Sequence, residues 1–325
     1  MCSRVLFVGE DGLVITGRTM DWYTPTGSNL WAMPSGIERH GATVENPFAW
    51  SATYGSLITT MYDKATCDGV NVAGLAANLL YLSSSVYPKR DAAIPGMCIS
   101  ALTQYVLDSF ATVAEAVAVL DDAPFQVTTT TVPGGESGTA HLSLSDRSGD
   151  SAIIEFLDGA VVIHHDPSYT VMTNDPPYAH QLALCAYFDE IGDGAFLPGT
   201  ERPSDRFVRA SHYLGRSAPT SDLATGVAEV FSITRNVSVP MVAPRSDEPN
   251  VAPTNWRTAI DHRELTYYFE STSQPNVFWV EVPNLDLAEG APILRLEAEN
   301  GPFRNGDTSS LFEPADAFAF LTDGD

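Results

Sequence analysis

The chain is poor in positive charge. Its 17 lysines and arginines stand against 41 aspartates and glutamates, for a formal net charge of −24, and only Lys64 and Lys89 are lysines. Such a surface repels nucleic-acid phosphates and anionic lipid head groups, so we expect neither nucleic acid nor a membrane as partner. Two origins of the acidic surface stay equally open, namely adaptation to high salt and a soluble protein from a high-GC genome.

Long hydrophobic runs are also missing. No segment approaches the ~18 apolar residues that would span a bilayer. The N-terminus, Met1–Arg4, lacks the charged region and long apolar stretch of a secretory signal peptide, which predicts a cytoplasmic protein. The 325 residues contain no repeat, low-complexity tract or clear linker, and one large domain accommodates this length. We therefore expect a single domain over residues 1–325.

Signatures of metal and serine hydrolases are absent as well. The four cysteines show no CxxC spacing and the seven histidines no HxxxH or HExxH spacing, so a zinc site finds no support. His164 and His165 adjoin on a predicted strand and must point to opposite faces. No GxSxG elbow indicates a serine nucleophile. We interpret Cys67, Cys98 and Cys185 as reduced thiols in or near the core.

The chain does contain an ordered succession of strand and helix patterns. Residues 2–8 and 13–18 are apolar, β-rich runs joined by Gly9–Gly12, which is typical of a hairpin. Helical spacing follows over 95–120, where Thr112-x-x-Glu115 is a capping box that begins a second helix. This succession favours antiparallel sheets covered by helical layers. Further strands are predicted over 49–60, 69–82, 141–145, 152–157, 160–165, 265–270 and 277–282, and further helices over 181–191, 204–214 and 222–234.

Cys2 differs from the other cysteines because it follows the initiator methionine. Once Met1 is removed, its α-amine, with a reference pKa of ~7.7–8.0, and its thiol, with one of ~8.5, place a base and a nucleophile in one residue. The predicted hairpin brings Arg18 and Asp21 back to the chain start. There Arg18 would stabilise a thiolate, and Asp21 would accept hydrogen bonds from the α-amine. The alternative for this pair is a surface salt bridge at a strand end.

Four separated motifs then occur in a characteristic order. They are Met1–Arg4 with Thr16–Trp22, Gly74–Leu82, Val171–Pro176 followed by Gln181, and Leu197–Gly199 followed by Asp205–Ala210. Together they resemble the choloylglycine hydrolase family, the bile salt hydrolases and penicillin V acylases. The resemblance implies an α+β, αββα sandwich of two antiparallel sheets between helical layers, the N-terminal-nucleophile hydrolase fold. It also implies hydrolysis of a linear, non-peptide C–N amide bond without metal or organic cofactor.

The resemblance also implies roles for single residues. Cys2 is the implied nucleophile and, through its α-amine, the base, and its acyl-thioester is hydrolysed by water. Asn174 and Asn78 are implied to stabilise the oxyanion, and Arg206 matches the family's active-site arginine. Without the family, the two asparagines would be turn residues and the arginine a cation on a helix surface. The implied catalytic residues are Cys2, Arg18, Asp21, Asn78, Asn174 and Arg206.

The implied substrate is an N-acyl amide, and the sequence does not identify its acyl group. The chain is similar to the group of the family with a shorter assembly region, which includes penicillin V acylases and enzymes that cleave acyl-homoserine lactones, whereas activity on conjugated bile salts varies. Well-studied members of that group carry a cleaved presequence, and this sequence shows none. The family further implies a homo-oligomer, a tetramer. An apolar acyl pocket is expected, for which the candidates, each also explained by core packing, are Met20, Trp22, Tyr23, Tyr62, Leu80, Tyr81, Tyr87 and Phe125.

Two other functions remain as alternatives. One is an acid-ceramidase-like or N-acylethanolamine-cleaving amidase on the same scaffold. The other is a catalytically silent relative that binds a small molecule. The presence of Cys2, Arg18 and Asn174 argues against the silent relative, since loss of any of them would have indicated it.

Overall fold

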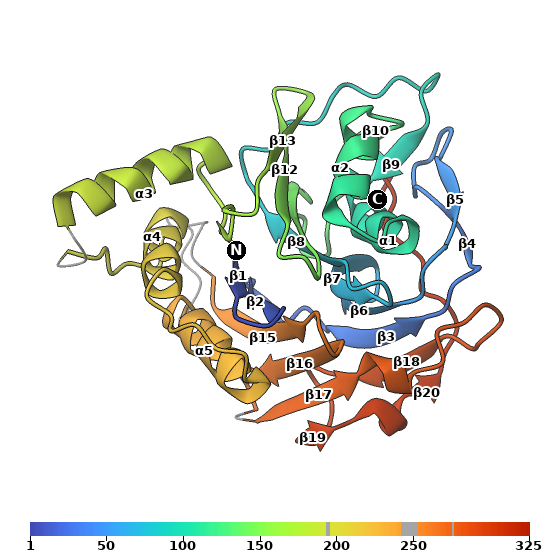
Figure 1. The fold of residues 1–325 in the computed structure, drawn as a ribbon. Coiled ribbons are helices and arrows are strands. Elements are labelled where there is room, and N and C mark those ends of the chain that lie inside the picture. The colour runs from blue at the N-terminus through green and yellow to red at the C-terminus, as the bar shows by residue number, and fades with distance from the viewer. Residues whose placement is uncertain (193–195, 242–251, 275) are drawn as a thin grey trace.

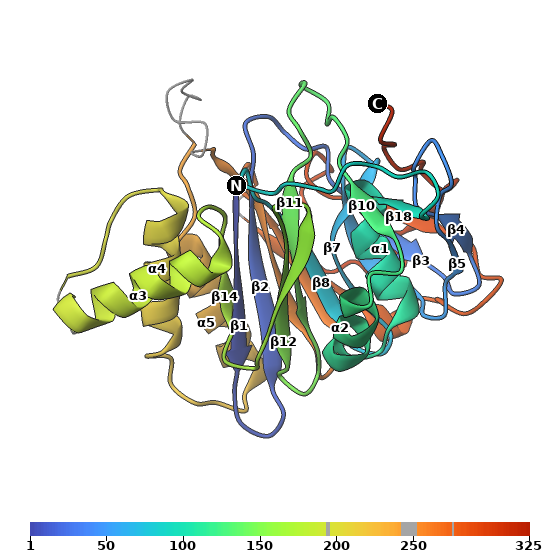
Figure 2. The same ribbon diagram turned by 90° about the horizontal axis from the view of Figure 1, so that it is seen from above.

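The computed structural model describes residues 1–192, 196–241, 252–274 and 276–325. Within this part of the chain, two large sheets lie face to face and helices cover both outer faces (Figures 1 and 2). Neighbouring strands of the two sheets are antiparallel, except for one short parallel pair at an edge. The predicted αββα sandwich is therefore confirmed.

The two sheets draw their strands from distant parts of the chain. In spatial order, the first contains β14 (Val171–Met172), β1 (Cys2–Val8), β2 (Val14–Asp21), β15 (Thr254–Asp261), β16 (Thr266–Ser271), β17 (Val277–Glu281) and β19 (Gly306–Asp307). The second contains β13 (Ala160–His165), β12 (Ser151–Leu157), β11 (Ala140–Ser145), β8 (Ala76–Tyr81), β7 (Ala65–Asn71), β6 (Ser56–Met61), β3 (Asn29–Met33), β18 (Leu294–Glu297) and β20 (Glu313–Pro314). Two small pairs join β4 (Glu38–His40) to β5 (Ala49–Ser51) and β9 (Gly96–Cys98) to β10 (Gln126–Thr128).

The helices form the two outer layers. α1 (Ile99–Ser109) and α2 (Val113–Asp121) pack on the second sheet, and α4 (Pro203–Leu214) and α5 (Leu223–Asn236) pack on the first. α3 (Tyr178–Gly192), yellow-green in Figure 1, lies along α4 and extends away from the sheets. One apolar core fills the space between the sheets and below α4 and α5, and another fills the space below α1 and α2. None of the helices in the described ranges is long and apolar enough to cross a membrane.

The N-terminal hairpin is confirmed, and its register positions the residues that matter. Cys2 pairs with Met20, and β2 runs on to Asp21, three residues beyond the predicted strand. Side chains alternate along a strand, so Cys2, Arg18 and Met20 point between the sheets, whereas Asp21 points toward the helical layer. Gly17 allows α5 to lie close to this hairpin, since a Cβ there would stand 2.3 Å from a methyl carbon of Val230.

Several predicted boundaries change in the structure. The run 69–82 is two strands, because Gly74 has a φ of +94° and reverses the chain between β7 and β8. The run 49–60 likewise divides into β5 and β6. The second helix begins as predicted, with the Glu115 N–H donating to Thr112 Oγ1 at 3.2 Å.

Candidate active site

The side chain of Cys2 lies between the two sheets at the start of β1. Cys2 is only 2% exposed. Its Sγ is 3.3 Å from Arg18 Nη2 and 3.9 Å from Met20 Sδ. Its backbone N–H donates to Asn174 Oδ1 at 2.9 Å. Two adjacent strands and the segment that follows β14 therefore meet at one cysteine.

Arg18 is fully buried and links the two sheets beside that cysteine. Its guanidinium donates to Cys67 O at 2.7 Å and to Leu79 O at 2.8 Å, where β7 and β8 cease to pair. Asp68 Oδ2 lies 3.7 Å from Nη1. Burial opposes the charge, but Cys2, Cys67 and Asp68 outweigh burial and raise the pKa of Arg18 above its usual value. A permanently charged guanidinium favours negative charge on the neighbouring Cys2 sulfur.

Arg206 of α4 reaches the backbone of Cys2 from the helical layer. It donates from Nη1 to Cys2 O and from Nη2 to Asn174 Oδ1, both at 2.8 Å. Asp21 Oδ1 accepts from Thr254 Oγ1 at 2.7 Å, and Asp21 Oδ2 lies 3.4 Å from Arg206 Nη1. Both charged side chains are inaccessible to solvent, so neither forms the surface contact considered from sequence alone. Within the described part of the chain, Asp21 Oδ2 accepts no hydrogen bond, which leaves it available to a further N–H.

Asn174 is held by hydrogen bonds at its side-chain nitrogen, at its carbonyl and, through Arg206, at its side-chain oxygen. Its Nδ2 donates to Tyr81 O at 2.6 Å, and its own carbonyl accepts from Gln181 of α3. The preceding residue is fixed too, because Thr173 Oγ1 donates to Gln181 Oε1 at 2.6 Å and Thr173 O lies 2.8 Å from His141 Nε2. These contacts orient the Asn174 amide with its oxygen toward Cys2 and its nitrogen toward β8.

A buried carboxylate, Glu155, supports the Asn174 segment from β12. Its Oε1 lies 3.3 Å from His141 Nδ1 and accepts the backbone N–H of Tyr178, the first residue of α3, at 3.0 Å. Burial would raise the pKa of Glu155, but hydrogen bonds from His141 and His164 lower it to about 2. The two nitrogens of His141 thus face a carboxylate and a carbonyl.

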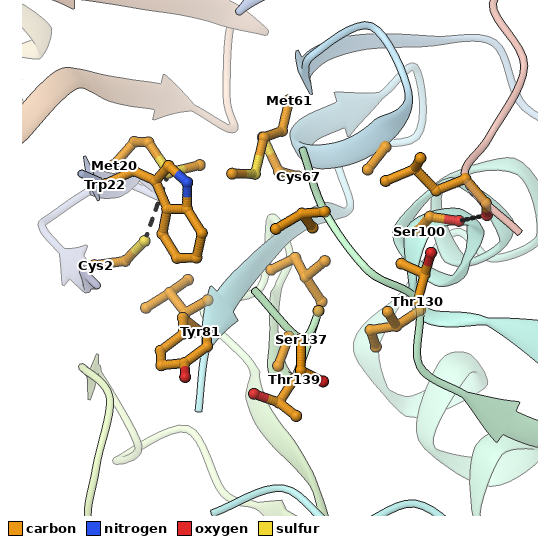
Figure 3. A pocket seen from close by; sticks show the side chains of 18 of the residues that line it. Cys2, Met20, Trp22, Met61, Cys67, Tyr81, Ser100, Thr130, Ser137 and Thr139 are labelled. Atoms are coloured by element: carbon orange, nitrogen blue, oxygen red, sulfur yellow. Dashed lines mark hydrogen bonds between the residues drawn. The ribbon is translucent and has the colours of Figure 1, made fainter. Parts of the chain in front are cut away.

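An apolar cavity of about 70 Å³ lies beside the Cys2 sulfur (Figure 3). Trp22 and Tyr81 stand next to Cys2, while Ser100 and Thr130 lie on the opposite side. The cavity is lined by Cys2, Arg18, Met20, Trp22, Met61, Ala65, Cys67, Leu79, Leu80, Tyr81, Ile99, Ser100, Thr130, Val132, Ser137, Gly138, Thr139, Ala140 and Leu321.

Half of the residues predicted for the acyl pocket lie along this cavity. They are Met20, Trp22, Leu80 and Tyr81. Tyr23 and Tyr62 lie against Trp22 instead: the Tyr23 and Trp22 rings are 5.6 Å apart, and Tyr62 Oη accepts from Trp22 Nε1 at 3.0 Å. The structure places Tyr87 and Phe125 against the core below α1 and α2, not along the cavity. Aromatic residues are equally suited to a core and to a pocket, so the sequence alone could not show which of these residues line the cavity and which pack in the core.

Asn78 differs from Asn174 in the partners of its side chain. Its Nδ2 donates to Asp68 Oδ1 at 3.0 Å, and its Oδ1 accepts from Ser143 Oγ at 3.3 Å. It is buried within the second sheet and is not among the residues that line the cavity. The strand β8 reaches the cavity through the following residues, Leu79–Tyr81.

Other residues of the site had no specific signal in the sequence. Asp68 and Glu155 are single carboxylates on strands, and Leu321 lies far from every motif. Cys67 is a free, buried thiol of the core, as expected, and it also lines the cavity, where burial raises its pKa to about 12. It therefore stays a protonated, weakly nucleophilic thiol near neutral pH. Among the residues that the structure describes, no three His, Cys, Asp or Glu side chains are grouped to bind a metal.

Known proteins are similar to this chain both in sequence and in fold. The pattern of the linear amide C–N hydrolases, choloylglycine hydrolase family, matches residues 2–295. A penicillin V acylase from Pectobacterium atrosepticum is 45% identical over 98% of this chain and 92% of its own length. The structure of a penicillin V acylase from Agrobacterium tumefaciens superposes with a TM-score of 0.93 at 47% identity, over 99% of this chain and 100% of that one. A conjugated bile acid hydrolase from Clostridium perfringens, 20% identical, shares the fold with a TM-score of 0.78 over 95% of this chain and 98% of its own.

Proposed function

This chain belongs to the choloylglycine hydrolase family, and from that premise we propose that it cleaves N-acyl amides of the penicillin V type with Cys2 as its nucleophile. As a member it is a hydrolase that acts on linear amides. The observation that carries the proposal is the Cys2 sulfur, 3.3 Å from the Arg18 guanidinium and on the wall of an apolar cavity. A charged donor and a surface suited to an acyl group meet at this atom.

Removal of Met1 would complete the nucleophile. With Met1 present, the Cys2 nitrogen is an amide, and the Met1 ammonium is buried against the carbonyl of Asp21. Burial lowers the pKa of that ammonium, so its charge is poorly stabilised there. The amine released on Cys2 would lie beside Asn174 Oδ1, which is 2.9 Å from this nitrogen. Asp21 Oδ2, which accepts no hydrogen bond in the described part of the chain, is the proposed second acceptor for this amine. It would serve as the base of the reaction.

The proposed oxyanion donors are Asn174 Nδ2 and the backbone N–H of Tyr81. One Nδ2 hydrogen binds Tyr81 O, so the second is available to a substrate oxygen. The Leu82 N–H donates to Thr139 O on the β11 side. Because successive N–H groups alternate between the two edges of a strand, the Tyr81 N–H faces the opposite edge, where Asn174 lies. This backbone donor takes the place considered for Asn78, whose side chain is bound to Asp68.

The reaction follows from these positions. The Cys2 thiolate attacks the amide carbonyl, and the oxygen takes up the negative charge at the two donors. The α-ammonium then gives its proton to the leaving nitrogen as the C–N bond breaks, so the acyl group remains on sulfur as a thioester. Water, deprotonated by the α-amine, adds to the thioester carbonyl. The C–S bond breaks, which releases a carboxylic acid and restores the thiolate.

The cavity favours a slender acyl group. Two relatives above 40% identity are penicillin V acylases, which supports a phenoxyacetyl amide. The volume of about 70 Å³ is below the ~150 Å³ of a cavity that holds benzene, so a phenoxy ring requires a lining side chain such as Trp22 to move. A straight-chain acyl amide, such as an acyl-homoserine lactone, is the second candidate, since its acyl group suits an apolar lining equally well. A conjugated bile salt is disfavoured by its bulky steroid.

Helix α3 supports the proposal of a homo-oligomer, a tetramer. Leu184, Tyr187 and Ile191 are 37%, 57% and 49% exposed. Their spacing of three and four residues places them on one face of the helix, and an exposed apolar face of this kind marks an interaction site. Light scattering should give a multiple of the 35.0 kDa chain mass, and Tyr187→Lys should reduce it. A monomeric wild type would contradict the proposal.

Trapping of the thioester tests the proposed chemistry. Wild-type protein mixed with penicillin V and quenched in acid should gain the mass of one phenoxyacetyl group, located by peptide mapping on Cys2. Cys2→Ala should gain nothing. The control is Cys67→Ser, which lacks the other thiol of the cavity and should still be acylated. Acylation of Cys67, or turnover with no acyl-enzyme on a Cys2 that carries a free amine, would count against the mechanism.

A further inference from the structure

The side of the catalytic cavity opposite Cys2 is formed in part by the C-terminal tail. Leu321 lines this cavity together with Ile99, the first residue of α1, and is 5% exposed. Ser100 and Thr130, which lie across the cavity from Cys2 in Figure 3, hold the tail there. The tail and the nucleophile, from the two ends of the sequence, therefore share one apolar space.

Hydrogen bonds to separate elements keep Leu321 in place. Its N–H donates to Lys64 O, next to β7, at 2.9 Å, and its carbonyl accepts from Ser100 Oγ of α1 at 2.6 Å. One residue on, the carbonyl of Thr322 accepts from Thr130 Oγ1 at 2.6 Å. A side chain whose backbone is fixed on both sides is a firm wall and cannot move aside at low cost.

The same hydrogen bonds make this end of the cavity apolar. The hydroxyl protons of Ser100 and Thr130 are used by carbonyls of the tail, so they are not free to bind a ligand. Ile99, Val132 and Leu321 contribute only hydrocarbon to the lining. An acyl group whose far end is a methyl or a phenyl loses no hydrogen bond here, whereas a hydroxyl or carboxylate at that end would be left unpaired.

We propose that Leu321 is the end wall of the acyl site and sets the length of the acyl group that the enzyme accepts. The inference rests on the proposed function, because it takes Cys2 as the point where the carbonyl carbon sits. With the carbonyl at Cys2, the chain extends past Trp22 and Tyr81 toward Ile99 and the tail. Leu321 is then a specificity-determining residue that does not take part in the chemistry.

Changing the size of this one side chain tests the wall. Amides of 6-aminopenicillanic acid with straight acyl groups from butanoyl to dodecanoyl share one leaving group, and penicillin V is the reference. Leu321→Ala should raise the ratio of kcat/KM for decanoyl over hexanoyl by about tenfold, since a methylene in an apolar pocket is worth about tenfold or more. Leu321→Phe should lower that ratio. The control is Leu311→Ala, also near the C-terminus but 49% exposed, which should leave the ratio unchanged.

Binding separates failure of this inference from failure of the proposed function. Calorimetry with hexanoate and decanoate, the expected products, reports the length preference without turnover. An unchanged ratio in Leu321→Ala, in kinetics and in binding alike, overturns the end wall even if every amide is cleaved. A shifted binding ratio with no cleavage by wild type keeps the wall and overturns the function. If Leu321→Ala does not fold, Leu321→Val should shift the ratio in the same direction by less.

Discussion

The surroundings of Cys2 are built from two kinds of residue. Those that we call the polar side, Arg18, Arg206 and Asn174, make directed hydrogen bonds to its sulfur, its carbonyl and its backbone N–H. Those that we call the apolar side, Met20 and Trp22, begin the apolar cavity, which Arg18 also lines. A buried charge is tolerated only while its partners are satisfied, so the polar side resists change. Apolar contacts have no direction and accept changes of shape at lower cost.

The difference assigns separate tasks to the two sides. In the proposed reaction the polar side would fix the sulfur, the amine and the oxyanion donors, so its variants should lower kcat. The apolar side would contact only the acyl group, so its variants should change KM or substrate preference. Each of the following predictions either breaks or sharpens this division.

Among variants that keep Cys2, the largest effect is expected from one of two buried asparagines. Asn174→Ala removes a proposed oxyanion donor and should lower kcat for penicillin V by about 10²–10³. Asn78→Ala leaves Asp68 Oδ1 without its partner, so it should cost about 1–3 kcal/mol of unfolding free energy and change kcat little. Steady-state kinetics and urea unfolding of both variants decide the matter. Equal losses of kcat would remove the distinction between the two residues.

A smaller effect is expected at Glu155, which does not touch the cavity. Glu155→Gln removes the charge opposite His141, whose other nitrogen binds the carbonyl of Thr173. The His141 ring is then held less firmly, and with it the backbone next to Asn174. We expect kcat to fall about tenfold, as for an outer partner of a site, with KM nearly unchanged. Glu190→Gln, on the exposed side of α3, is the matched control and should behave as wild type. A rise in KM alone would place Glu155 outside the polar network.

Glu155 also predicts a pH dependence of stability. Its pKa in the folded protein is about 2, below the usual 4.5, so its ionised form stabilises the fold above about pH 4.5 and that contribution disappears as the pH falls toward 2. The wild type should exceed Glu155→Gln by on the order of 3 kcal/mol at neutral pH, and by progressively less between pH 4.5 and 2. Urea unfolding at several pH values measures the difference. A constant difference would contradict the assigned charge.

The smallest effect is expected at Tyr62, on the apolar side. Tyr62→Phe removes the acceptor of Trp22 Nε1 and allows the indole to move. Because the phenoxy ring requires Trp22 to move, losing one hydrogen bond of about 1 kcal/mol corresponds to about a fivefold fall in KM for penicillin V, with kcat within twofold. Tyr213→Phe, remote from the cavity, is the control. A fall in kcat at constant KM would show that Trp22 acts in the chemistry as well as in binding.

The parts of the site that are local in sequence could be predicted from it. The hairpin pattern with a short turn determines that residues near 18 and 21 return to Cys2, and the register of β1 and β2 confirms this. Asn174 and Arg206 were reached only through the family resemblance, because no local pattern relates the segment after β14, or a helix beyond residue 200, to the chain start. The αββα fold was reached through the resemblance and through the succession of strands and helices.

The remainder depends on contacts between distant strands, which a single sequence does not specify. Nothing local distinguishes Asn78, bound to Asp68, from Asn174, bound to Cys2. In the sequence alone, Glu155 is indistinguishable from any charged residue on a strand, although it faces the buried His141. Leu321 is likewise indistinguishable from any other apolar residue of the tail. Their roles emerge only when the two sheets and the tail are assembled.

The most direct test of the central claim is hydrolysis of penicillin V by wild type, Cys2→Ala and Cys67→Ser, with the N-terminal residue of each determined by mass spectrometry. We predict that wild type without Met1 releases 6-aminopenicillanic acid, that Cys67→Ser retains most of this activity, and that Cys2→Ala is inactive with an unchanged circular dichroism spectrum. Cleavage by folded Cys2→Ala at the wild-type rate would contradict the assignment of Cys2 as the nucleophile.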